Sequence, residues 1–110
     1  MGMYTEFVFG CTFKEDTPDE IIEYVREMLD TELRGSSYYT GYPKRINSFS
    51  YDKIARAYIL AIRCSIKNYS MQIEDFIKKI KPYIDSGSGS SDFLGYYVYE
   101  ESEKPTLIYL

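Results

Sequence analysis

Three tyrosines and two basic residues share one short stretch, and this cluster is the clearest candidate for binding chemistry in the sequence. The stretch covers residues 35–45, and another arginine precedes it. Its glycine, serine and proline content is typical of a loop. Aromatic rings give contact area at low entropic cost, and cations attract anions. Two interpretations stay open: a binding loop for an anionic or aromatic ligand, or a loop folded over a sheet edge. The residues concerned are Arg34, Tyr38, Tyr39, Tyr42, Lys44 and Arg45.

Catalysis and metal binding have little support in the residue types. The chain has no histidine and two cysteines, so it lacks the usual base at neutral pH and cannot supply four Cys and His ligands to zinc. Acidic residues gather between Glu15 and Glu23 without calcium-loop spacing, and the dipole of a helix beginning there explains them. Residues 87–91 lack the lysine of a phosphate-binding loop. We predict no metal site, no cofactor and no enzymatic activity, with a tyrosine acid or base as the remaining enzymatic alternative.

Charge and length narrow the class of protein further. The 110 residues fit one domain, 1–110, and the net charge is −4. An acidic chain is a poor ligand for nucleic acid or for an anionic membrane surface. The longest apolar run, residues 57–62, is too short to span a bilayer, and the start of the chain does not resemble a secretion signal. We expect a cytoplasmic protein with no nucleic-acid or membrane partner.

The elements that must position any site are predicted from hydrophobic periodicity. Alternating apolar positions predict strands over 3–13, 45–51, 57–67, 93–100 and 106–110. Helical spacing predicts one helix that begins at Thr17-Pro18, with Glu20 closing a capping box, and reaches Leu33 before Gly35. A second helix is predicted to begin at Ser70 and to end near Pro82.

This order predicts an α+β fold. The pattern strand–helix–strand–strand–helix–strand is typical of the ferredoxin-like two-layer sandwich (βαββαβ), here with an extra C-terminal hairpin strand. Right-handed crossovers place the first and third strands side by side and antiparallel at the centre of the sheet. Cys11 and Cys64 then face the helices near opposite ends of these strands, too far apart for a bridge, so we predict two buried, reduced thiols.

The sheet face opposite the helices is the second candidate site. Alternation places Glu6, Val8, Ile59, Ala61 and Arg63 there, and we assign Tyr97 and Tyr99 of the fourth strand to the same face. Such a face is more apolar than a fully solvated one, which is typical of an association surface. We predict a homodimer, or a complex with another protein, through Val8, Ile59, Ala61, Arg63, Tyr97 and Tyr99. The alternative is that the last strand or the tyrosine loop covers this face within one chain.

Two short stretches carry a resemblance. The residues Met3-Tyr4-Thr5-Glu6, followed by Lys14-Glu15-Asp16-Thr17-Pro18, resemble the opening of small uncharacterised proteins encoded by phages and bacterial genomes. The resemblance covers about a quarter of the chain, and part of it is a helix-capping pattern. It implies a cytoplasmic accessory protein and carries no catalytic residues.

Overall fold

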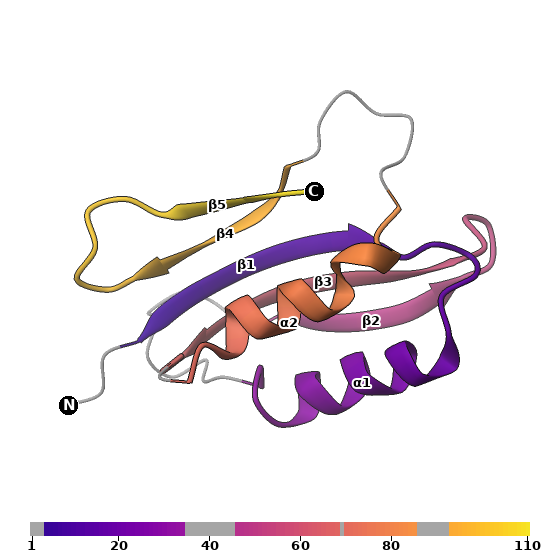
Figure 1. Cartoon of the computed structure of the whole chain (residues 1–110), viewed down its shortest axis with the longest axis horizontal. Coiled ribbons are helices and arrows are strands. Elements are labelled where there is room, and N and C mark those ends of the chain that lie inside the picture. The colour runs from indigo at the N-terminus through magenta and orange to yellow at the C-terminus, as the bar shows by residue number, and fades with distance from the viewer. Residues whose placement is uncertain (1–3, 35–45, 69, 86–92) are drawn as a thin grey trace.

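The computed structural model of the protein describes residues 4–34, 46–68, 70–85 and 93–110 (Figure 1). The predicted α+β class is confirmed. The elements in chain order are β1 (Thr5–Thr12), α1 (Asp19–Asp30), β2 (Ile46–Asp52), β3 (Ala57–Ile66), α2 (Gln72–Ile80), the short 3₁₀ turn η1 (Lys81–Tyr83), β4 (Phe93–Tyr99) and β5 (Thr106–Tyr109).

The strands form one antiparallel sheet with the order β2-β3-β1-β4-β5. The first and third strands therefore lie side by side at its centre, as predicted. Both helices lie on the same side of the sheet (Figure 1), which gives the molecule two layers. β3 and β4 are both antiparallel to β1, so they are parallel to each other. The helix α2 connects them and therefore runs in the opposite direction to both strands.

The core lies between the sheet and the helices, and alternation in the strands builds it. Phe7, Phe9 and Phe13 are buried on β1 and just beyond it, while residues at even positions of β3 supply the neighbouring side chains. Phe76 of α2 joins both layers, because its ring lies edge-on to Phe9 at 6.4 Å and stacks with Tyr24 of α1 at 6.1 Å. The predicted inward faces of β1 and β3 are thus confirmed, except that Cys11 is only half-buried.

The helices begin differently from the prediction. The side chain of Thr17 donates to the carbonyl oxygen of Lys14 at 2.6 Å, and Pro18 occupies the N-cap position of α1 with no side-chain cap. The predicted capping box is therefore wrong. Ser70 does not cap α2 either; the side-chain oxygen of Asn68 accepts from the backbone N–H of Ile73 at 2.9 Å. Both helices rest mainly on their buried apolar faces, as most short helices do.

The C-terminal ends of the two helices agree better with the prediction from the sequence. The regular part of α2 stops at Ile80, and Pro82 lies in the 3₁₀ turn that follows, as expected for a residue without a backbone N–H. On the other helix, α1 ends at Asp30, and Leu33 beyond it is still buried. The predicted terminator Gly35 and the predicted linker 87–91 lie outside the described residues.

Candidate functional site: the open face of the sheet

Strand register decides which side chains lie on the sheet face opposite the helices. Residues paired across neighbouring strands share a face, and Val8 on β1 pairs with Arg63 on β3 and with Tyr96 on β4. Arg63 in turn pairs with Ile46 on β2, and Tyr96 with Leu107 on β5. These five residues form one row across all five strands, which we call the central row: Ile46, Arg63, Val8, Tyr96 and Leu107.

Apolar side chains surround this row. On β3, Ala61 and Ile59 lie two and four residues from Arg63 and therefore on the same face, where Ile59 is 37% exposed. On β4, Val98 lies two residues from Tyr96 and shares its face. At the outer side of the sheet the rings of Phe93 and Tyr109 meet edge-on at 5.5 Å. The open face, as we use the term below, comprises the central row with Glu6, Ile59, Ala61, Phe93, Val98 and Tyr109.

One charged pair lies within this apolar surface. A guanidinium nitrogen of Arg63 lies 3.7 Å from a carboxylate oxygen of Glu6. The same carboxylate oxygen accepts a hydrogen bond from the Tyr96 hydroxyl at 3.4 Å. Both charged side chains remain partly exposed, at 36% and 24% for Arg63 and Glu6. The pair is therefore positioned on the sheet and still accessible to a partner.

The assignment of two tyrosines to this face is wrong. Tyr97 pairs with Phe7, which is fully buried on the helix side, and Tyr99 pairs with Thr5 on that same side. Burial raises the pKa of the Tyr97 hydroxyl, and the charge of Glu74 and a hydrogen bond to it on α2 raise it further. The β4 residues on the open face are instead Tyr96 and Val98. The other predicted members, Val8, Ile59, Ala61 and Arg63, do share this face, although their role as an interface stays a prediction.

The tyrosine-rich loop can be placed only in part. Tyr38, Tyr39, Tyr42, Lys44 and Arg45 lie outside the described residues. Arg34 is described and exposed, and its backbone N–H donates to the carbonyl oxygen of Thr31 at 3.3 Å. The structure therefore brings together four of the six residues of the sheet-face hypothesis, Val8, Ile59, Ala61 and Arg63, whereas the ligand-loop hypothesis stays a prediction.

Both cysteines are free thiols on the helix side of the sheet. Cys64 pairs with Phe7, and Cys11 pairs with Leu60, so the two lie four positions apart along neighbouring strands. Burial raises the pKa of the Cys11 thiol from 9.0 to about 12. A thiol held in its neutral form is a poor nucleophile, so Cys11 is a packing residue.

The shifted pKa of Cys11 predicts a loss of stability in alkali. Between pH 9 and about 12 the thiol ionises in the unfolded chain while it stays protonated in the folded one. The unfolded state then binds fewer protons, so the free energy of unfolding falls as pH rises through this range. Urea unfolding of the wild type and of Cys11→Ala at pH 8 and pH 10 should show a smaller loss for the variant. Equal losses would contradict the burial of this thiol.

Other binding chemistry is limited in the described part of the chain. No group of three or more Cys, Asp or Glu residues there is placed to hold a metal ion. Among the described helices none is long and apolar enough to cross a membrane. No family model, curated protein or solved structure matches this chain.

Proposed function

We propose that this protein is a non-catalytic interaction domain that forms a homodimer through its open face. The observation that carries the proposal is the open face: its central row crosses all five strands, and its Arg63–Glu6 pair lies among partly exposed apolar side chains. Isolated apolar residues on a surface are ordinary, but a contiguous apolar patch on a folded domain commonly marks an interface.

A second copy of the chain fits this face because its charges complement themselves. Arg63 and Glu6 lie on adjacent strands. In a two-fold dimer the same patch meets itself, so residue i of one copy contacts residue j of the other and the reverse. A two-fold axis near Val8 brings each arginine toward the partner's glutamate and packs Ile59 and Leu107 around them. A different protein on this face is the competing outcome.

The size of the face is also of the right order. Five strands about 4.8 Å apart, with about eight residues rising roughly 3.3 Å each, present about 600 Å². A stable interface of standard size buries about 800 Å² per partner, and protruding side chains add to the flat area of the sheet.

A non-catalytic role agrees with the titration behaviour of the described residues. In that part of the chain the resolved pKa shifts belong to Cys11, Tyr24 and Tyr97, and burial is the largest cause of each. All three pKa values are raised, so each group stays in its neutral form at physiological pH. A catalytic acid, base or nucleophile works best with a pKa near the operating pH, and these shifts move all three pKa values further from neutrality.

We also propose the ferredoxin-like class for the fold, with β5 as an added hairpin strand. The split βαβ element order and the place of β1 between β3 and β4 support it. In such a sandwich one face of the sheet is covered by helices and the other is available for association.

The test is the solution mass of Ile59→Asp. Burying a carboxylate in an apolar interface is costly, so this variant is expected to be monomeric under conditions in which the wild type is a dimer. Light scattering across a dilution series measures this directly. A monomeric wild type at every concentration would remove the proposal, and a dimeric Ile59→Asp would move the interface away from this face.

The matched control is Ile54→Asp. Ile54 is 96% exposed in the turn between β2 and β3, so the same chemical change there is expected to leave the mass unchanged. Charge reversal adds a second measurement: Glu6→Arg and Arg63→Glu should each weaken the dimer, and their combination should restore it. Circular dichroism on every variant shows whether the fold is retained.

A further inference from the structure

The two edges of the sheet differ in a way that bears on partners. Edge strands invite pairing with another chain unless charges, prolines or a covering element prevent it. The β2 edge carries the charged Asp52, and its Asn47 side chain donates to the carbonyl oxygen of Leu29 on α1 at 3.0 Å. The β5 edge, Thr-Leu-Ile-Tyr, carries no charged residue, although Leu107 and Tyr109 are about as exposed as Ile46 and Tyr51 on β2. β5 is thus the edge best suited to accept another strand.

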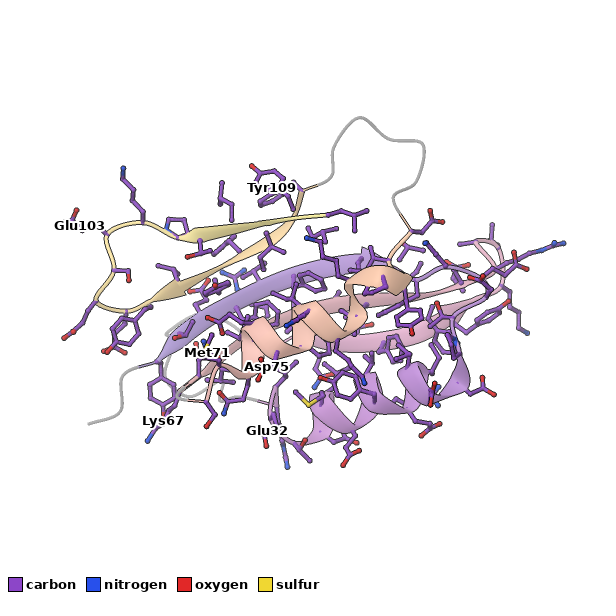
Figure 2. The ribbon with its side chains drawn as sticks, in the orientation of Figure 1. Glu32, Lys67, Met71, Asp75, Glu103 and Tyr109 are labelled. Carbon is purple, nitrogen blue, oxygen red and sulfur yellow. The ribbon has the colours of Figure 1, made fainter. Side chains whose placement is uncertain are left out.

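A groove accompanies this edge on the helix side. A pocket of about 260 Å³ lies between α2 and β5 and is lined by Glu74, Ile77 and Lys81 from the helix side and by all four β5 residues. Ile77 is only partly buried against the core, and Lys81 at the end of the helix is exposed. Figure 2 shows Tyr109 directed away from α2, so its ring leaves the helix side of this edge open.

The two walls of the groove run in the same direction. β5 is antiparallel to β4, and α2 runs opposite to β4 as well, so α2 and β5 are roughly parallel (Figure 1). Glu74 accordingly lies near Thr106 at the start of β5, since both contact Tyr97. Lys81 lies toward Tyr109 at the end of β5, with Ile77 between the two charges.

We propose that β5 and this groove bind an extended peptide segment of another protein, added antiparallel to β5. The segment carries an acidic residue against Lys81 and, two positions later, an apolar residue against Ile77. The spacing fits, because alternate strand residues are about 6.6 Å apart and four helical residues rise about 6 Å. Lys81 makes no ion pair within the part of the chain that the structure describes, so its charge is available.

A second copy of this chain is the less suitable occupant. Antiparallel pairing of two β5 strands brings the start of one strand to the end of the other. On that route Pro105 directly precedes β5, and Lys104 comes one residue earlier. Each lysine would then approach Lys81 of the other copy, and like charges in contact oppose association. An acidic segment of a different protein meets Lys81 with the opposite charge.

The test uses two synthetic peptides of equal composition. The first reads Ser-Thr-Glu-Thr-Val-Thr-Ser-Thr and places the glutamate before the valine; the second reads Ser-Thr-Val-Thr-Glu-Thr-Ser-Thr and reverses them. Titration into isotope-labelled full-length protein, followed by NMR, should shift the backbone amides of 106–109 and 77–81. The first peptide is expected to bind about threefold more tightly, the range of one exposed ion pair.

Lys81→Glu should abolish or reverse this preference, whereas Lys53→Glu, the same charge change in the exposed turn between β2 and β3, should leave it unchanged. Running both titrations on Ile59→Asp as well keeps self-association through the open face out of the result. Amide shifts at β2 or on the open face instead of β5, equal binding of the two peptides, or no saturable binding at millimolar peptide would overturn the proposal.

Discussion

Gly95→Ala is expected to destabilise the fold by at least about 3 kcal/mol, the upper end of the cost of overpacking. A Cβ atom at this position would lie 2.0 Å from the carbonyl oxygen of Val8 and 2.8 Å from the Cα of Phe9. Both are backbone atoms of β1, so no side-chain rotation relieves the overlap. The strands β1 and β4 would have to move apart, and the added strand pair β4–β5 would lose its attachment to the rest of the sheet.

Equilibrium urea unfolding at one fixed protein concentration measures this effect, because a dimer makes apparent stability depend on concentration. Gly10→Ala is the matched control. Gly10 also lies in β1, but a Cβ there would meet the Leu60 carbonyl oxygen at an ordinary 3.4 Å. We expect the control to be neutral or slightly stabilising, since alanine reduces the entropy of the unfolded chain. A Gly95→Ala variant as stable as this control would contradict the close approach of β1 and β4.

Alternation predicts the inner strands well because their two faces differ. On β1 the phenylalanines all lie at odd positions, and on β3 most of the large apolar side chains lie at even positions. Turning these positions toward the helices buries most of the apolar surface of both strands, so the inward face is clear from the sequence. The same reasoning fails on β4, because its two faces are equally apolar: Tyr96 and Val98 lie on one face, and Tyr97 and Tyr99 on the other. Register settles the matter, because Gly95 lies opposite Phe9 and fixes Tyr97 opposite Phe7.

Local signals predict the helices but not how they begin. The capping-box pattern at Thr17 and Glu20 is present, yet the Thr17 hydroxyl bonds backwards to Lys14 and so tightens the turn before the helix. At α2 the cap comes from Asn68, five residues before the N–H that it accepts from. Asn68 has a positive φ of 44°, a conformation that asparagine tolerates better than most residues. A serine nearer the helix is the stronger signal in the sequence, so Asn68 is not found from spacing alone.

The sequence predicts the location of the candidate site on the open face, but not all of the residues that belong to it. The charged pair and the apolar residues on β1 and β3 follow from their parity. Sequence reasoning misses Ile46, Leu107 and Tyr109 on the edge strands and Phe93 before the bulge in β4, because only the pairing register tells which of these side chains join the open face. Their half-exposed apolar side chains also distinguish an association face from an ordinary solvated one.

Phe76→Ala is expected to cost about 3–5 kcal/mol, a large part of the roughly 5–15 kcal/mol that holds a domain of this size folded. The Phe76 ring is fully buried and contacts Phe9 on the sheet and Tyr24 on α1. Its removal leaves a cavity where the two helices and the sheet meet. Lys78→Ala, an exposed change on the same helix, should alter the free energy of unfolding by less than about 0.5 kcal/mol. Since α2 forms one wall of the groove, weakened β5 binding in a folded Phe76→Ala but not in Lys78→Ala would tie the groove to this core contact. Equal urea midpoints for the two variants would contradict the place of Phe76 at the junction of the layers.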